Sequence, residues 1–180
     1  MSGYNHRSAA LSKKNKAAKD EGASFEKMII DACNYYCDKG IADVDKTPEP
    51  VRQISKKNER GQFWACYEKK AQPDFKGTIK GGKSMVFDAK STITEKIAVS
   101  VLSDEQRKHL ILHDRLGAKS GVLMCFSFRY FFFIPIKTFL NAKELNGHAH
   151  WTVHDAALHG ETVRHTGTFL DFLEVLNGQS

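Results

Sequence analysis

The sequence has 180 residues, 41% of them hydrophobic and 27% charged, which excludes a wholly disordered chain and is enough for one core without metal or disulfide support. Its 27 Lys and Arg residues exceed its 21 Asp and Glu residues, which leaves a formal net charge of +6. A basic balance of this kind favours an acidic partner, most often nucleic acid.

The cysteines and the apolar stretches indicate where the protein works. Its four cysteines have neither C-x-x-C spacing nor a matching pair at zinc-finger distance, so we expect free thiols in a reducing compartment. The polar, basic N-terminus does not resemble a signal peptide, and the most apolar stretch, residues 121–136, is short for a membrane span. We therefore expect a cytoplasmic protein without a membrane partner.

The N-terminal region divides at residue 24. Residues 1–23 have few and small apolar side chains, and we expect a flexible basic arm. The arm residues that we expect to contact DNA phosphates are Lys13, Lys14 and Lys16. Apolar residues from Phe25 to Tyr36 then recur with helical spacing, Ser24 is a suitable N-cap, and Gly40 follows the helix. We expect residues 24–180 to form a single domain.

A basic excursion follows this helix. Pro48 and Pro50 exclude a helix there, so residues 41–60 are expected to form a projecting, mostly extended excursion that returns at Phe63. Its candidate DNA-binding residues are Lys46, Arg52, Lys56, Lys57 and Arg60. Residues 62–67 are expected to be a strand, in which Trp64 and Tyr67 are better explained by core or dimer contacts than by base stacking.

The remaining elements predict a mixed α/β domain. Two strands flank a Gly81-Gly82 turn, a helix begins at Ser103, and two adjacent strands follow Gly117. Short helices are expected at residues 137–145 and 168–176, with a loop between them. The order is helix, three strands, helix, two strands, with the projecting stalk between the first helix and the hairpin.

Three side chains can carry chemistry. Asp88 and Lys90 lie two apart on one strand and share a face, and pairing with the preceding strand brings Asp74 beside Asp88. Adjacent carboxylates repel unless a cation neutralises them, and Mg²⁺ suits two carboxylates together with phosphate and water. Lys90 can orient or help to deprotonate an attacking water, or stabilise charge on phosphorus. The alternative is a solvated strand face with an ordinary ion pair.

The order of the motifs resembles the PD-(D/E)xK nuclease superfamily and, more narrowly, the RecU-type Holliday junction resolvases. The resemblance covers roughly residues 22–145. The stretches that carry it are Gly22-Ala-Ser-Phe-Glu-Lys-Met-Ile-Ile, Asn34-Tyr-Tyr, Gly40-Ile-Ala, Lys46-Thr-Pro-Glu-Pro, Tyr67-Glu-Lys-Lys-Ala-Gln-Pro-Asp-Phe-Lys-Gly77 and Phe87-Asp-Ala-Lys-Ser-Thr92. The sequence departs from the family at Asp88, where Glu is commoner, at Gln72-Pro73, and at Glu105, where the family tends to have His.

The resemblance implies a restriction-endonuclease-like fold, a homodimer, and symmetric cutting of four-way DNA junctions that depends on Mg²⁺, for which Mn²⁺ can substitute. Asp74 and Asp88 would bind the metal and Lys90 would be the catalytic lysine. Glu26 and Gln106 would complete the catalytic site. The stalk of the family, which projects from the dimer and enters the junction, would correspond to residues 44–66 of this sequence.

Several alternatives remain open at this level. The same site can serve a nuclease that acts on ends, nicks or flaps, and a non-catalytic DNA-binding module can carry the same residues as an ion cluster. Glu26 can be an ordinary acid favoured by the helix dipole, and Gln106 can be the capping partner of Ser103. Residues 146–180 have no assigned counterpart in the family.

Overall fold

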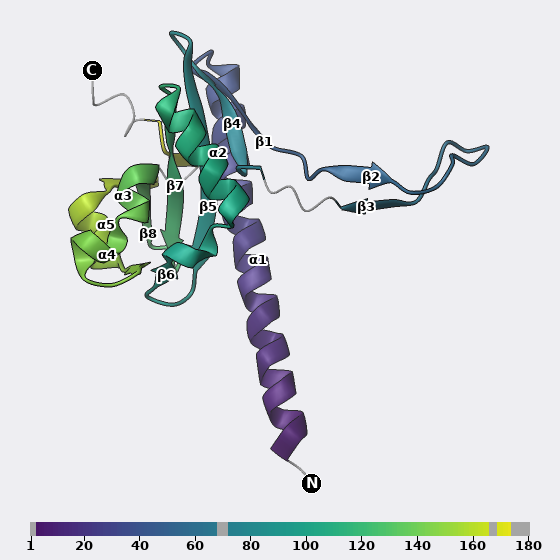
Figure 1. The fold of residues 1–180 in the computed structure, drawn as a ribbon, viewed down its shortest axis with the longest axis horizontal. Helices are drawn as coiled ribbons and strands as arrows, with labels where there is room; N and C mark the ends of the chain where they lie inside the picture. The colour runs from purple at the N-terminus through teal and green to yellow at the C-terminus, as the bar shows by residue number, and fades with distance from the viewer. Residues whose placement is uncertain (1–2, 68–71, 166–168, 174–180) are drawn as a thin grey trace.

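The structure is a computed structural model that describes residues 3–67, 72–165 and 169–173. Its centre is a six-stranded mixed sheet in the order β1-β4-β5-β7-β8-β10 (Figure 1). The strands of this sheet are β1 (Ala42–Lys46), β4 (Phe75–Ile79), β5 (Lys83–Thr92), β7 (Lys119–Phe126), β8 (Tyr130–Pro135) and β10 (Glu161–Thr162). β5 and β7 run parallel, and the other neighbours are antiparallel.

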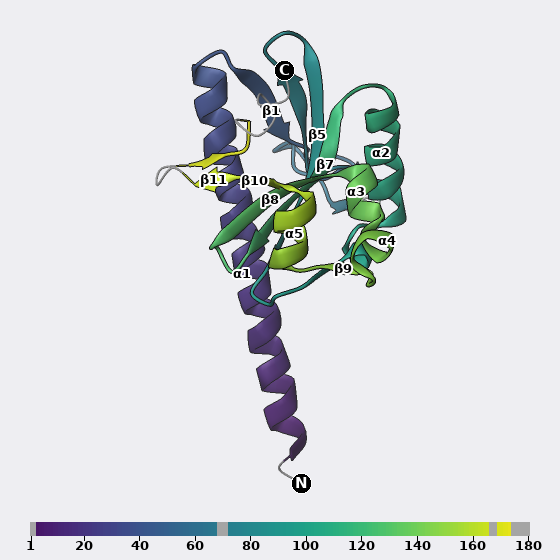
Figure 2. The same cartoon turned by 90° about the vertical axis from the view of Figure 1, so that its left-hand side faces the viewer.

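Helices cover both faces of the sheet (Figures 1 and 2). One face packs on α1 (Gly3–Asp38), and the other packs on α2 (Asp104–Arg115), α3 (Ile136–Leu140) and α5 (Val153–His159). Strand alternation separates the two cores: Met85 and Phe87 lie with α1, whereas Val86 lies with α2. The expected α/β core with helices and a projecting stalk is confirmed, and no helix among the described residues is long and apolar enough to cross a membrane.

The first helix is longer than predicted. It begins at Gly3 rather than after Ser24, so the predicted N-cap is wrong. The Ser24 hydroxyl instead donates to the carbonyl of Asp20, one turn earlier in the same helix. Residues 1–23 contain no proline and several alanines, lysines and leucine, all of which are compatible with a helix. The flexibility expected for this arm stays a prediction.

The stalk is present, but its boundaries differ from the predicted ones. β1, which the sequence analysis missed, is the edge strand of the main sheet, so the projection begins after Lys46 rather than at residue 44. Of the predicted strand at residues 62–67, the part Ala65–Tyr67 is confirmed as a strand, but it does not join the main sheet. Ala65–Tyr67 form β3, which pairs with β2 (Val51–Gln53) as a separate two-stranded ribbon away from the core (Figure 1).

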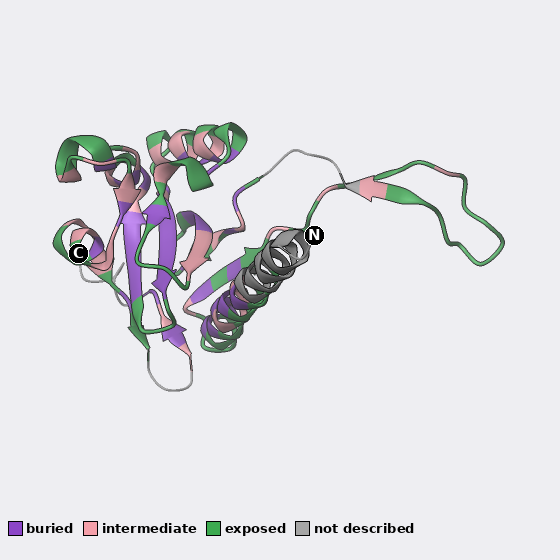
Figure 3. Ribbon diagram, turned by 90° about the horizontal axis from the view of Figure 1, so that it is seen from below, coloured by how far each residue is buried: buried purple, intermediate pink, exposed green. Residues whose placement is uncertain are grey.

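The side chains of the stalk are mostly exposed (Figure 3). Trp64 is 77% exposed and Phe63 43% exposed, so neither belongs to a core in this chain. The Lys57 ammonium lies 6.0 Å from the centroid of the Phe63 ring. The stalk is therefore an extended, basic ribbon whose aromatic rings face solvent, and the described residues do not bury it.

The C-terminal region is more ordered than predicted. The expected helix at 137–145 is two helices, α3 and α4 (Ala142–Asn146). The expected loop contains α5 and β9 (His150–Trp151). β9 pairs with β6 (Ile97–Ala98), and the 3-10 helix η1 (Val99–Val101) follows β6 in the chain. The expected helix at 168–176 lies partly outside the described residues. Its described part holds β12 (Leu170–Asp171), paired with β11 (Arg164–His165), so a helix there is wrong.

Gly77 allows β4 to approach β1 closely. A Cβ atom built at this position would lie 2.0 Å from the carbonyl oxygen of Asp43. We expect Gly77→Ala to lower the free energy of unfolding by about 2 kcal/mol or more, because backbone must move to relieve the overlap. Gly22→Ala is the matched control. A Cβ atom built at Gly22, in the middle of α1, has no atom within 4 Å, and alanine is more favourable than glycine in a helix by about 1 kcal/mol. Thermal unfolding should therefore shift in opposite directions, and equal shifts would contradict the explanation.

Candidate active site

The β4–β5 hairpin brings Asp74 to Asp88. In its register Phe75 lies opposite Phe87, so the residue before β4 meets the residue that follows Phe87. The backbone N–H of Asp74 donates to Oδ1 of Asp88 at 2.9 Å, and the backbone N–H of Ala89 donates to Oδ2 of Asp74 at 3.0 Å. Each carboxylate is thus held by a backbone donor from the other strand, which fixes both orientations.

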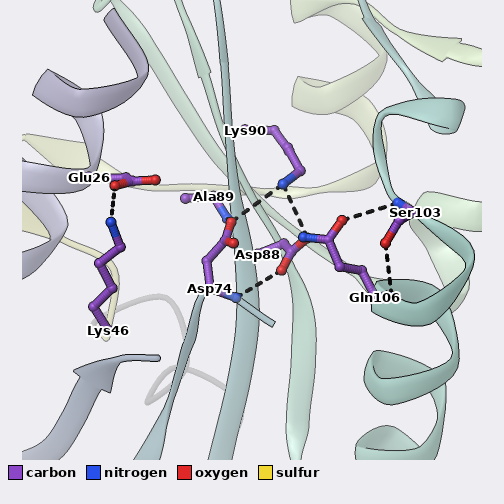
Figure 4. A network of polar contacts seen from close by, with 8 residues as sticks. All are labelled: Glu26, Lys46, Asp74, Asp88, Ala89, Lys90, Ser103 and Gln106. Atoms are coloured by element: carbon purple, nitrogen blue, oxygen red, sulfur yellow. Dashed lines mark hydrogen bonds and ion pairs between the residues drawn. The ribbon is translucent and has the colours of Figure 1, made fainter. Parts of the chain in front are cut away.

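Lys90 joins the two carboxylates (Figure 4). Its Nζ lies 3.2 Å from Oδ2 of Asp88 and 3.4 Å from Oδ2 of Asp74. The Asp74 side chain is 23% exposed, that of Lys90 16%, and that of Asp88 is fully buried. The cluster predicted from the sequence is therefore present, with one edge open to solvent at Asp74 and Lys90.

Burial decides the protonation behaviour of this cluster. Loss of solvent raises the pKa of Asp88 to about 6; the Lys90 charge acts against this and the Asp74 charge adds to it. Burial alone would lower the pKa of Lys90, but the two carboxylates outweigh it, and the pKa rises above its ordinary value. At neutral pH Lys90 therefore carries a proton in this arrangement and can donate a hydrogen bond or stabilise negative charge.

The acid pair fits a hard divalent cation. Oδ2 of Asp88 is buried and has no hydrogen-bond partner among the residues that the structure describes, and the Lys90 ammonium lies 3.2 Å from it. A carboxylate oxygen left in this way, beside a second carboxylate, is the donor type that Mg²⁺ prefers. Within the described ranges no group of three or more His, Cys, Asp or Glu side chains can hold a metal, so the protein would supply two carboxylates and leave the other positions to water and phosphate.

Glu26 does not join the acid pair. It lies on α1, half-buried, and its carboxylate pairs with the ammonium of Lys46 at the end of β1 (Figure 4). Two residues that were predicted for different roles, catalysis and DNA binding, therefore neutralise each other. The pair lies beside the chain entry to the stalk, since Lys46 is opposite Phe75 in the sheet.

Gln106 is the capping partner of Ser103. The Ser103 backbone N–H donates to Oε1 of Gln106 at 3.1 Å, and the Gln106 backbone N–H donates to the Ser103 hydroxyl at 3.2 Å. This capping box explains both residues. Gln106 is also buried, and Figure 4 shows its side chain on the side of the acid pair that faces α2. Its catalytic role stays a prediction.

The predicted DNA-binding residues lie in three places. Arg52, Lys56, Lys57 and Arg60 are exposed on the stalk. Lys46 belongs to β1, and Lys16 is exposed on α1. The side chains of Lys13 and Lys14 lie outside the described part of the chain.

Backbone groups that the sequence analysis missed connect the stalk to the acid pair. The N–H of Thr47, the first residue after β1, donates to the carbonyl of Asp74 at 2.8 Å. Gln72 accepts a hydrogen bond from Lys76 at 3.2 Å across the same turn. Main-chain donors have no side-chain signature, so only the pairing of β1 with β4 reveals that the stalk leaves the sheet directly at Asp74.

A family model and two curated relatives match the chain. The model of recombination protein U, RecU, matches residues 20–178, which extends the expected range of 22–145 through the C-terminal region. The Holliday junction resolvases RecU of Streptococcus gordonii (strain Challis) and Streptococcus sanguinis (strain SK36) are each 30% identical, over 102 and 106 residues. These matches cover 51% and 53% of this chain but 50% and 52% of the relatives, so they span about half the length of each relative.

A solved structure is also similar. It is that of Hjc, a Holliday junction resolvase from Archaeoglobus fulgidus, with 15% sequence identity and a TM-score of 0.47. The match covers 77% of this chain and 93% of that chain.

Proposed function

The chain belongs to the RecU family, and from this premise we propose that it is a metal-dependent DNA endonuclease that resolves four-way junctions by paired, symmetric cleavage. Branched DNA is the proposed substrate and Mg²⁺ the proposed cofactor, with Mn²⁺ as a substitute. The observation that carries the chemistry is the cluster of Asp74, Asp88 and Lys90, in which Nζ of Lys90 lies 3.2 Å from Oδ2 of Asp88 and 3.4 Å from Oδ2 of Asp74.

The residues of the cluster have separate roles in this proposal. Asp74 and Asp88 would hold Mg²⁺, which when bound supplies a Lewis acid for phosphodiester hydrolysis. Lys90, protonated at neutral pH, stabilises the negative charge that develops on the phosphate oxygens as water attacks. The backbone amides of Asp74 and Ala89 keep both carboxylates oriented without help from the substrate.

The stalk and a second subunit would give the selectivity for junctions. The basic stalk leaves the sheet at Asp74, so DNA that contacts the stalk also lies near the acid pair. Paired cuts need two sites, and a two-fold dimer matches the symmetry of a four-way junction. Light scattering should give the mass of two chains; a monomer would favour the nuclease that acts on ends, nicks or flaps.

The direct test compares DNA substrates. A synthetic four-way junction and a linear duplex of the same sequence are incubated with the protein, with and without Mg²⁺, beside Asp88→Asn. Paired, symmetric cuts in the junction alone, lost in the variant, support the proposal. If the protein also cuts linear DNA, the proposed junction resolvase would be replaced by a general nuclease. If it binds the junction tightly but does not cut it with any divalent metal, a non-catalytic DNA-binding module would be the better explanation.

Salt dependence tests the role of the stalk. Lys56, Lys57 and Arg60 are exposed, and each phosphate that a cation neutralises adds about −0.9 to the slope of log affinity against log salt. We expect the triple substitution to alanine to flatten this slope by about 2 to 3, measured by fluorescence anisotropy with a junction. Lys143→Ala should leave the slope unchanged, because Lys143 is exposed on α4, which lies on the other side of the molecule from the stalk (Figure 1). An unchanged slope in the triple variant would exclude the stalk from phosphate contact.

The affinity for Mg²⁺ should depend on pH through Asp88. Its pKa is raised to about 6, so the carboxylate is ionised above this pH and increasingly protonated below it. Because a protonated carboxyl is a poor ligand, we expect affinity to be retained at pH 7–8 and to fall by up to about tenfold per pH unit below 6. Calorimetric titration of the metal checks this. Asp38→Asn, which removes an exposed carboxylate at the end of α1, should give the same profile as the unmodified chain.

A further inference from the structure

A cavity lies beyond the end of β5, the strand that carries Asp88 and Lys90. It has a volume of about 460 Å³ and lies between the loop after β5, the β7–β8 turn and the start of α5. The residues used below are Thr94, Glu95, Ser127, Arg129 and Tyr130, all of which line it. Small-molecule and cofactor sites in proteins have volumes of this order. The acid pair does not line this cavity, and no step proposed above uses it.

The cavity is attached to the strand that carries the acid pair. Thr92, the last residue of β5, lies on the same face as Asp88 and Lys90 because side chains two apart share a face. Its hydroxyl bonds to the hydroxyl of Thr94, at 2.7 Å, and accepts from the backbone N–H of Thr94. At about 3.3 Å per residue, Thr92 lies roughly 13 Å along the strand from Asp88. A DNA strand bound at the acid pair can cover this distance within a few nucleotides.

The turn that forms one wall of the cavity is strained. Ser127 and Phe128 have φ angles of 51° and 52°, and they are the non-glycine residues with positive φ in the described part of the chain. For a bulky side chain this conformation is rare. Ser127 is held there by its N–H to the carbonyl of Thr92, at 2.8 Å, and by its hydroxyl to the carbonyl of Ile93, at 3.3 Å. Strain that is held in this way is commonest at ligand sites.

The groups around the cavity match the parts of a nucleotide. The guanidinium of Arg129 is exposed and has no ion-pair or hydrogen-bond partner among the described residues, so it is available for a phosphate. Tyr130 is 50% exposed and offers a ring for stacking, which any base accepts. The carboxylate of Glu95, also exposed, would repel a bare anion but can accept a hydrogen bond from the amino group of a base.

We propose that this cavity binds one nucleotide of the DNA strand that runs on from the scissile phosphate, with its phosphate on Arg129 and its base against Tyr130. The identification of the ligand as DNA rests on the proposed function. The cavity would add affinity and set the position of the strand along β5, while the acid pair performs the cleavage.

Crosslinking and affinity test this proposal in the full chain. The Asp88→Asn variant keeps the DNA intact, and a four-way junction carries 5-iododeoxyuridine at one position after another along a strand. Irradiation should crosslink one narrow set of positions to the peptide that contains Tyr130. In the same background, Arg129→Ala and Tyr130→Ala should each weaken junction binding about tenfold, as expected for one phosphate contact or one stacked base. Tyr130→Phe should restore affinity because it keeps the ring.

The controls separate this proposal from the proposed function. Arg164→Ala removes an exposed arginine on β11 that pairs with Asp171, and its affinity should stay within about twofold of the parent. In a chain with Asp88 intact, Mg²⁺ bound at the acid pair should raise the melting temperature. The rise should be the same with and without Arg129→Ala, because Arg129 is not part of the acid pair. If Arg129→Ala and Tyr130→Ala both keep normal cleavage and unchanged junction affinity, the proposal that the cavity binds a nucleotide is overturned. The proposed nuclease function would then still stand. If the Tyr130 peptide is crosslinked and both variants lose affinity, but the unmodified chain cuts no DNA, nucleotide binding in the cavity is supported and the proposed nuclease function is overturned.

Discussion

Asp88→Asn is expected to abolish Mg²⁺ binding and to reduce junction cleavage by on the order of 10³-fold or more, because an amide replaces a charged oxygen ligand. The substitution preserves shape, and Oδ1 of asparagine can still accept the N–H of Asp74. Calorimetric titration with Mg²⁺ and single-turnover cleavage of a junction measure the two losses.

The same variant should be more stable than the unmodified chain when no metal is present. Because the folded-state pKa of Asp88 is raised to about 6, its ionised form opposes folding above that pH, and the penalty disappears as the pH falls toward 4. We expect the free energy of unfolding to rise by on the order of 2 kcal/mol at pH 8 in EDTA and to change little at pH 4.

If Asp88→Asn instead keeps full cleavage, and the unmodified chain binds no Mg²⁺, then Asp74, Asp88 and Lys90 form an ion cluster in a non-catalytic module.

Lys90→Met is expected to lower the rate of cleavage by about 10²- to 10³-fold while junction affinity changes little. Methionine keeps most of the apolar stem of lysine but removes the ammonium that lies between Asp74 and Asp88. Loss of this charge removes a group that stabilises charge on phosphate, whereas both carboxylates remain. Single-turnover rates at saturating protein separate the chemical step from binding.

Lys76→Met is a matched control for this prediction. Lys76 lies on the neighbouring strand β4 and is exposed, and its ammonium bonds to Gln72 rather than to the acid pair. Its cleavage rate should stay within a few-fold of the unmodified chain. Equal losses in the two variants would mean that general positive charge near the sheet, and not the position of Lys90, supports the reaction.

Strand alternation and turn chemistry alone predicted that Asp74, Asp88 and Lys90 lie together, and the structure brings them together. The Gly81-Gly82 turn set the register of the hairpin, and the spacing of Asp88 and Lys90 placed both on one face, so their meeting with Asp74 required only local pairing. The capping box of Ser103 and Gln106 was equally local, and the structure contains both of its hydrogen bonds. The prolines and cations after Lys46 also indicated a projecting stalk. These features depend on residues close in the chain, whose relations follow from backbone geometry.

The tertiary structure decided the features that depend on distant partners. It made β1 the edge of the main sheet and moved Ala65–Tyr67 into the stalk, which short apolar runs cannot distinguish. It paired Glu26 with Lys46, continued α1 back to Gly3, and enclosed the cavity beside Arg129 between three separate segments. Above all, it buried Asp88 completely. The loss of solvent that raises its pKa comes from packing by residues far along the chain, so the amino-acid sequence specifies which groups can react, and tertiary packing sets their charge and environment.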